Sequence, residues 1–202
     1  MIEEDEIKHL SSRAMPSLYD KSGQRKYLNS EERKRFKAQA AEASDEIYAF
    51  CWVLHETGCR ISEALELTPE RIDLAGGMIV FESLKKRRDG VFRAVPVSEE
   101  LLQHLAATFG IIDGSSSDTP IWGWSRMTAY RYVKQVMEKA GIHGVQATAK
   151  GLRHGFAIAA IEVGIPLNLV QRWLGHADLA TTAIYADAVG GEERKIARKL
   201  WR

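Results

Sequence analysis

Residues 44–97 read SDEIYAFCWVLHETGCRISEALELTPERIDLAGGMIVFESLKKRRDGVFRAVPV. Ser44 is a helix-capping residue followed by two acids, and apolar side chains then recur at helical spacing until Gly58. A shorter apolar helix is predicted directly after that glycine. Two β-rich segments, 78–81 and 91–97, flank an Asp-Gly pair that is typical of a tight turn. This order predicts a buried helix, a short helix and an antiparallel hairpin.

Helical patterns surround this segment on both sides. On the N-terminal side, Ser30 precedes an acidic first turn, and Phe36 with nearby alanines supplies an apolar face. On the C-terminal side, capping residues and glycines delimit further predicted helices at 98–109, 125–140, 149–163, 166–174, 178–187 and 191–201. The chain is therefore predicted to be mainly α with a small antiparallel β-sheet, an α+β fold.

Composition excludes several classes of protein. The chain has 202 residues, 45% of them hydrophobic and 27% charged, as in soluble globular proteins and unlike disordered or fibrous ones. There is no apolar run of the roughly 20 residues that cross a bilayer, and the start is acidic rather than a basic leader. We therefore expect no membrane association and a cytoplasmic location. A net charge of +1 does not by itself point to nucleic acid.

The two cysteines predict neither a disulfide nor a metal site. Cys51 and Cys59 lie eight residues apart, about 12 Å along a helix, which is too far for a disulfide bond. His55 between them gives a spacing that points three ligands off one helical face, but a closed zinc site needs a fourth ligand. Buried helix positions explain the same three residues. We expect free thiols, no metal and no cofactor.

Basic side chains gather in two places along the chain. One cluster lies in the N-terminal arm and first helix and includes Lys26 and Arg33. The other is the run of Lys85, Lys86, Arg87 and Arg88 before the hairpin turn. Charge runs are usually solvated faces. Two separated basic surfaces also suit a protein that holds the phosphate backbone of duplex DNA from more than one side.

Four separated motifs carry a resemblance to a known family. They are Thr57-Gly58-Cys59-Arg60-Ile61-Ser62-Glu63-Ala64-Leu65, Gly151-Leu152-Arg153-His154, Leu174-Gly175-His176 and Thr181-Thr182-Ala183-Ile184-Tyr185. In this order, with the hairpin between the first two, the chain resembles the tyrosine recombinase (phage integrase) family. The resemblance implies a catalytic domain over 26–190, after an N-terminal arm over 1–25 and before an amphipathic tail helix over 191–202.

The resemblance also implies the site residues. Arg60 and Arg153 are expected to clamp a phosphate, since planar guanidinium groups suit its nonbridging oxygens. His176 is expected to assist, and Tyr185 to be the nucleophile. The hairpin is expected to supply a catalytic lysine, Lys85 or its neighbour Lys86. Lys150 is also expected to be catalytic, as a hydrogen-bond donor near the phosphate. It stands where the family often has histidine, although lysine also occurs there, so the residue that takes the tyrosine proton is left open. No role is expected for His154 or His143.

The implied function is site-specific DNA recombination through a 3′-phosphotyrosine intermediate, which needs neither metal nor ATP. The expected DNA contacts are Lys26, Arg33, Lys86, Arg87 and Arg88. Two alternatives stay open. One is a DNA-relaxing enzyme of the type IB topoisomerase kind, although the compact Leu-Gly-His motif favours a recombinase. The other is a non-catalytic DNA-binding regulator, although the full set of site residues argues against it.

The expected partners are double-stranded DNA and further copies of the chain. Ile196, Ala197, Leu200 and Trp201 share one side of the predicted tail helix, which predicts docking into an apolar groove. The resemblance favours a neighbouring subunit as the owner of that groove, within a tetramer on DNA. Family members commonly carry a further DNA-binding domain that the residues before Lys26 are too few to form. We therefore expect either a compact recombinase or a catalytic fragment.

Overall fold

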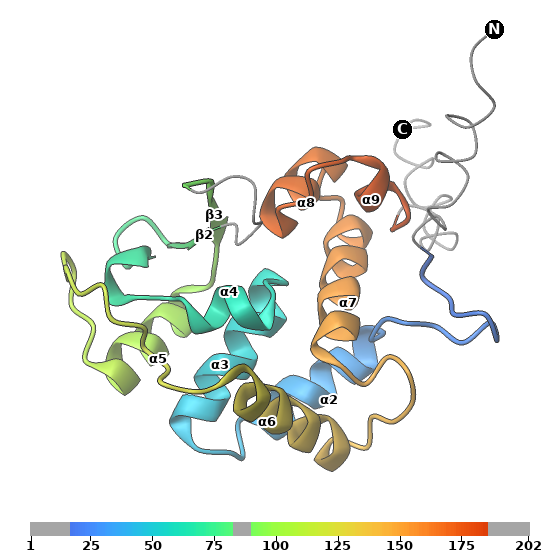
Figure 1. Cartoon of the computed structure of the whole chain (residues 1–202), viewed down its shortest axis with the longest axis horizontal. Coiled ribbons are helices and arrows are strands. Elements are labelled where there is room, and N and C mark those ends of the chain that lie inside the picture. Colours follow the sequence, from blue (N-terminus) through green and yellow to red (C-terminus); the bar gives the residue numbers. More distant parts are fainter. Residues whose placement is uncertain (1–16, 83–89, 186–202) are drawn as a thin grey trace, which may run out of the picture.

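The computed structural model describes residues 17–82 and 90–185, and it is mainly helical (Figure 1). The helices are α2 (Ser30–Ala40), α3 (Asp45–Thr57), α4 (Ile61–Leu65), α5 (Glu99–Phe109), α6 (Arg126–Lys139), α7 (Ala149–Glu162), α8 (Leu167–Leu174) and α9 (Ala180–Ala183), with a 3₁₀ turn at Pro69–Arg71. The strands are β1 (Ile72–Asp73), β2 (Met78–Glu82) and β3 (Phe92–Pro96). The predicted fold class is confirmed.

Side-chain caps explain where the helices begin. The Ser98 hydroxyl accepts from the backbone of α5, and Thr148 does the same for α7. Helix α2 differs from the prediction, because Asn29 rather than Ser30 is its cap. The Asn29 side chain accepts from the Glu32 N–H at 2.9 Å, and the Glu32 carboxylate accepts from the Asn29 N–H at 3.0 Å. This reciprocal pair satisfies two helix-end donors at once.

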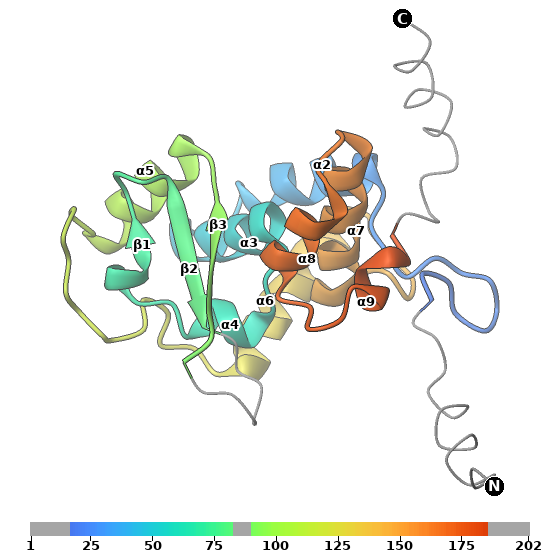
Figure 2. The same ribbon diagram turned by 90° about the horizontal axis from the view of Figure 1, so that it is seen from above.

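The sheet has three antiparallel strands in the order β1-β2-β3 (Figure 2). The hairpin predicted from the sequence is β2 and β3, in which Phe81 pairs with Arg93. Strand β1 was not predicted, since two residues are too few to show an alternating pattern. The inward side chains of the hairpin are Ile79, Phe81, Arg93 and Val95. Arg93 is the one charged residue among these four, and its side chain is buried with the other three.

Helix α3 is the centre of the larger hydrophobic core, because most of its side chains are buried. It contacts α2, α5 and α7. A second apolar cluster joins α7 to α8 and includes Tyr185. Helix α7 contributes side chains to both clusters and so connects them.

No helix among the described residues is both long and apolar enough to span a bilayer.

Two predicted elements fall at the edge of the described residues or beyond it. The helix predicted over 178–187 is present as the short α9, and the description ends at Tyr185. The tail helix predicted over 191–201 lies outside the described residues. Residues 17–25 of the expected arm contain an isolated bridge between Tyr19 and Arg25 rather than a helix. The proposed domain boundaries stay predictions.

Candidate active site

Arg60 is held by a buried carboxylate at the start of α4. Its Nη1 donates to Oε1 of Glu63 at 2.6 Å, and its backbone N–H donates to Oε2 at 2.8 Å. The Arg60 side chain is 39% exposed while Glu63 is buried. One edge of the guanidinium is therefore fixed, and the rest of the group faces solvent with further N–H donors.

The same carboxylate also binds Arg93, which sequence reasoning missed. Nη2 of Arg93 donates to Oε2 of Glu63 at 2.6 Å, and its Nε donates to the Trp173 carbonyl at 2.7 Å. Burial alone would raise the pKa of Glu63, but Arg93 and Arg60 outweigh it and hold that pKa below its usual value. The available signal was a charged residue at an inward position of β3. Glu63 thus connects the sheet, α4 and α8.

Arg153 on α7 is 7% exposed and donates to two backbone carbonyls. Nη1 reaches the Gly58 carbonyl at 2.7 Å and Nη2 reaches the Leu174 carbonyl at 2.6 Å. Burial, followed by repulsion from Arg60, lowers the pKa of Arg153 to about 10, so the group stays charged at pH 7. Among the described residues no carboxylate forms an ion pair with it. Within the part of the chain that the structure describes, Arg153 is therefore a buried cation held by backbone carbonyls and not by a carboxylate.

Glycine is required where Arg153 is bound. Gly58 ends α3 with φ +62°, and a Cβ there would lie 2.5 Å from the Phe156 ring and 3.1 Å from Leu174. The missing side chain lets the end of α3 approach α7 and α8 closely enough for Arg153 to reach the carbonyl oxygens of both α3 and α8. This is the physical reason for a glycine three residues after His55, in the first of the four motifs.

His176 and Tyr185 lie together after α8. Nδ1 of His176 is 2.9 Å from the Thr182 hydroxyl, and its ring stacks on Tyr185 with centroids 6.3 Å apart and an interplanar angle of 16°. Tyr185 is 1% exposed. Burial raises its pKa to about 12, although the positive charges of Arg153 and Arg60 oppose that rise. Four residues that the motifs singled out, Arg60, Arg153, His176 and Tyr185, are thus brought into one neighbourhood.

His154, to which the sequence assigned no role, touches the tyrosine hydroxyl. Its Nδ1 lies 2.8 Å from the Tyr185 oxygen. Burial, then the charges of Lys150, Arg153 and Lys26, lower the pKa of His154 to about 4, so the imidazole is neutral at pH 7. The sequence signal was its position directly after Arg153, but adjacency on a helix does not reveal a contact with a residue 31 positions away.

Two of the predicted lysines lie near this histidine. Lys150 is exposed on the first turn of α7, one helical turn before His154. Lys26 is partly exposed, and its backbone N–H donates to the Leu18 carbonyl at 2.7 Å. Both charges lower the pKa of His154, the residue that touches the Tyr185 hydroxyl. Lys85, Lys86, Arg87 and Arg88 lie outside the described residues.

Arg33 does not fit the DNA contact expected of it. The residue is 9% exposed, and its guanidinium donates to the His55 carbonyl at 3.0 Å and to the Leu152 carbonyl at 3.3 Å. Burial lowers its pKa to about 10. The prediction took a basic residue beside exposed ones to be exposed as well, and the structure buries it. Instead Arg33 ties α2 to the end of α3 and to α7, and it satisfies a carbonyl in the last turn of α3.

Cys51 and Cys59 are both buried, and burial raises each thiol pKa to about 12. Within the two described ranges, no group of three or more His, Cys, Asp or Glu side chains is arranged to hold a metal ion. The chemistry of the neighbourhood around Tyr185 is therefore that of arginine, histidine and phenol groups. Such a set stabilises an oxyanion and positions a hydroxyl nucleophile.

Comparison with known proteins agrees with this geometry. The model of the phage integrase family matches residues 26–190. The chain belongs to that family, and the resemblance drawn from the four motifs is confirmed. Tyrosine recombinase XerA of Pyrococcus furiosus is 32% identical over 143 residues, which cover 66% of this chain and 47% of that protein. The chain thus spans about half the length of this curated relative.

Two solved structures share the fold. The crystal structure of XerA recombinase superposes with a TM-score of 0.71 at 27% identity, covering 94% of this chain and 67% of that one. The XerH site-specific recombinase, in a pre-cleavage complex with its difH substrate, also has a TM-score of 0.71. It is 22% identical and covers 91% of this chain and 60% of its own. The fold is therefore that of a tyrosine recombinase catalytic domain.

Proposed function

We propose that this chain cuts and rejoins DNA strands as the catalytic part of a site-specific recombinase. The observation that carries the proposal is the pair of cations beside Tyr185. Arg153 is buried and charged, no carboxylate among the described residues forms an ion pair with it, and both Arg153 and Arg60 act electrostatically on the tyrosine. A DNA phosphate is an anion that fits two guanidinium groups and lies within reach of a hydroxyl nucleophile. The named activities of the relatives support the same reading.

The reaction conserves the energy of the phosphodiester bond. The Tyr185 oxygen attacks the phosphorus, the bond to the 5′ oxygen breaks, and the 5′ oxygen takes up a proton. The products are a 3′-phosphotyrosine and a free 5′ hydroxyl, and the reverse attack rejoins DNA without ATP. Arg60, Arg153 and His176 stabilise the charge on the phosphate oxygens. We propose Lys85, or Lys86, as the proton donor to the leaving oxygen.

Contacts to the DNA backbone extend from this centre. The positive charges of Lys26 and Lys150 act on His154, which supports a role in binding the DNA backbone beside the attacked phosphate. Lys86, Arg87 and Arg88 of the hairpin are proposed to hold the backbone from another side. Arg33 is left out because it is buried against backbone carbonyls. Since the proposed substrate is DNA, we propose that the protein acts on nucleoid or plasmid DNA in the cytoplasm.

A nicked duplex tests the proposal. Duplexes tiled across DNA that flanks the coding region would carry a nick near each candidate site, so that cleavage releases a short fragment and traps the covalent intermediate. We expect a denaturation-resistant adduct, with nucleotides attached to the peptide that contains Tyr185 in mass spectrometry. Binding without an adduct would favour the regulator instead. Relaxation of supercoiled plasmids regardless of sequence would favour the topoisomerase.

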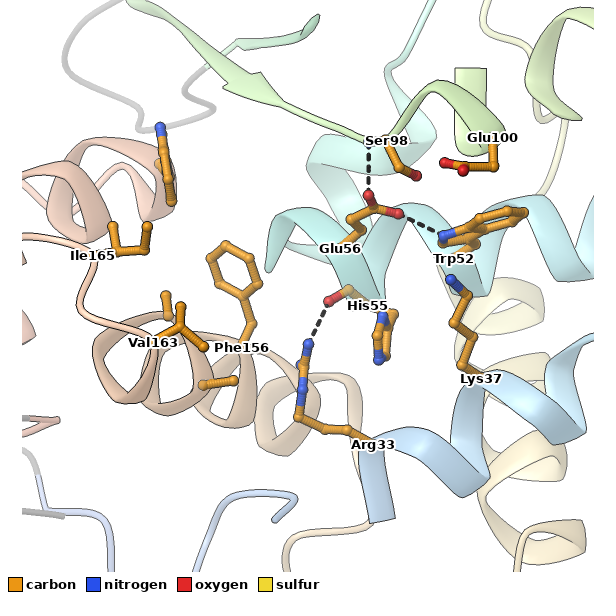
Figure 3. A pocket seen from close by; sticks show the side chains of 13 residues that line it. Arg33, Lys37, Trp52, His55, Glu56, Ser98, Glu100, Phe156, Val163 and Ile165 are labelled. Atoms are coloured by element: carbon orange, nitrogen blue, oxygen red, sulfur yellow. Dashed lines mark hydrogen bonds between the residues drawn. The ribbon is translucent and has the colours of Figure 1, made fainter. Parts of the chain in front are cut away.

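We also propose that copies of the chain assemble on DNA through the tail, residues 191–202. A groove of about 700 Å³ between α2, α3, α7 and α8 supports this (Figure 3). Its apolar lining includes Trp52, Phe156, Val163, Ile165 and Trp173, and its edge carries both basic and acidic side chains. The tail sequence offers matching chemistry, with apolar residues at 196, 197, 200 and 201 between charged ones.

Charge substitution at the lip of the groove tests this assembly. Val163 is 77% exposed, so Val163→Glu should fold normally and weaken tail docking. We expect the complex of four subunits on two DNA sites to be lost in sedimentation experiments, while adduct formation on a half-site is retained. Ile112→Glu is the matched control, because Ile112 is 73% exposed and does not line the groove. Equal assembly by the two variants would contradict the proposed role of the groove.

A further inference from the structure

The Tyr185 hydroxyl has a built hydrogen-bond partner in His154. Nδ1 of the histidine lies 2.8 Å from the tyrosine oxygen, and the two rings are tilted by 51°. His154 is on α7, whose neighbouring residue Arg153 is fixed by two backbone carbonyls. The helix thus presents a phosphate-binding cation and a hydrogen-bond partner for the nucleophile from consecutive positions.

The protonation states favour a hydroxyl that donates to the ring. The pKa of Tyr185 is raised to about 12, chiefly by burial, so its oxygen carries a proton at pH 7. The pKa of His154 is lowered to about 4 by burial and by Lys150, Arg153 and Lys26, so the ring is neutral. In the tautomer with hydrogen on Nε2, the Nδ1 lone pair accepts the O–H. Attack on phosphorus requires that this proton leave.

We propose that His154 is a further catalytic residue, which accepts the Tyr185 proton at Nδ1 as the tyrosine oxygen attacks the DNA phosphate. The inference rests on the proposed strand-cleavage function. The Oη–P bond forms and the P–O5′ bond breaks, while the Oη–H proton passes to Nδ1 and makes an imidazolium. The leaving 5′ oxygen takes a separate proton from the hairpin. In rejoining, the imidazolium returns its proton to the tyrosine oxygen.

The surroundings of His154 suit this step once DNA is bound. The cations that disfavour an imidazolium in the free protein are Lys150, Arg153 and Lys26. A bound phosphodiester adds negative charge among these groups and makes the protonated ring less unfavourable. Lys150 does not compete for the proton, because a lysine ammonium donates hydrogen bonds and accepts none. The sequence left open which residue takes the Tyr185 proton. His154, one helical turn after Lys150, is assigned that role.

Three substitutions separate proton transfer from simple orientation. In His154→Asn an amide oxygen replaces Nδ1 as an acceptor but does not take up a proton at neutral pH. His154→Gln carries its amide further along the side chain, near the Nε2 position. His154→Phe removes both nitrogens. We expect all three to cleave at least about 100-fold more slowly than wild type in single-turnover assays, the lower end of the usual contribution of a general base. DNA affinity should stay close to wild type, and thermal midpoints should fall by no more than roughly 2–4 °C, the effect of losing about 1 kcal/mol.

A modified substrate can separate deprotonation of the nucleophile from protonation of the leaving group. A duplex with sulfur in place of the bridging 5′ oxygen has a leaving group that needs no proton donor, so it restores variants of the hairpin lysine. It should not restore the His154 variants. With this substrate, cleavage by His154→Asn should rise about tenfold per pH unit between pH 7 and 9, because it then depends on prior ionisation of Tyr185. Wild type should rise less steeply.

Several outcomes would overturn the inference. Wild-type activity in His154→Asn would show that only an acceptor is needed. Unchanged or faster cleavage by His154→Phe would show that the contact merely shelters the hydroxyl in the DNA-free protein. Rescue of these variants by the sulfur substrate would assign His154 to the leaving group. Failure of the strand-cleavage proposal itself is a different result, since wild type would then form no adduct.

Discussion

Replacing Tyr185 by Phe is expected to abolish the covalent protein–DNA adduct completely. Phenylalanine lacks the oxygen that must bond to phosphorus, and no change in binding or electrostatics substitutes for a missing nucleophile. The expected result is a loss below the detection limit on denaturing gels with the nicked duplex. Native gels should show that the variant still binds the same DNA, because Arg60, Arg153 and the basic residues around them are unchanged.

The fold should survive this substitution. The Tyr185 ring packs in the apolar cluster of α7 and α8, and Phe keeps that ring. The lost hydrogen bond to His154 is expected to cost about 1 kcal/mol, measured by chemical unfolding. Tyr130→Phe is the matched control, since Tyr130 is exposed on α6 and should retain full activity. An adduct formed by Tyr185→Phe would assign the nucleophile to another residue.

Glu63→Gln is expected to cause the largest loss of stability among these changes. The buried carboxylate compensates Arg60 and the buried Arg93 at the same time. A neutral amide leaves Arg93 buried without a counter-charge. Removing one partner of a buried ion pair typically costs about 3–5 kcal/mol, a large share of the roughly 5–15 kcal/mol that stabilises a domain. Urea unfolding of the purified variant measures the difference.

The pH dependence of unfolding checks whether the negative charge of Glu63 causes this loss of stability. Since the folded protein holds the pKa of Glu63 below its usual 4.5, the ionised carboxylate stabilises the fold above that pH. This contribution is lost as the pH falls through the lower, folded-state pKa. The difference between wild type and Glu63→Gln should therefore shrink below pH 4.5. Glu31→Gln, which breaks an exposed pair with Lys34, should change stability by less than about 1 kcal/mol. Equal effects of the two variants would contradict the role of Glu63.

Local signals predicted most of the fold. Capping residues and left-handed glycines placed α3, α5, α6, α7 and α8 within a residue or two, because those signals act inside one helix turn. The β-rich segments on either side of the Asp-Gly pair predicted the hairpin of β2 and β3, whose strands are joined by residues 83–91. Strand β1 was missed because its two residues form a strand only by pairing with β2.

The site was predictable as a set of residues and not as a set of contacts. The motifs pointed to Arg60, Arg153, His176 and Tyr185, and these do meet in the structure. Lys85 and Lys86 stay predictions, since they lie outside the described residues. The burial of Arg33 was not foreseen, because charge in a sequence does not indicate exposure. His154 was overlooked because its partner is distant in the chain.

Sequence alone determined the family, the order of the helices and the hairpin, because each depends on residue types within short segments, and it predicted Tyr185 as the nucleophile. Tertiary structure decided which cations compensate one another, which stay unpaired, and which nitrogen touches the tyrosine oxygen. Glu63 meets Arg93 across 30 residues of chain, and His154 meets Tyr185 across 31. Hydrogen bonds and desolvation depend on distances of a few ångströms, and only the packing of α4, β3, α7 and α8 against one another sets those distances.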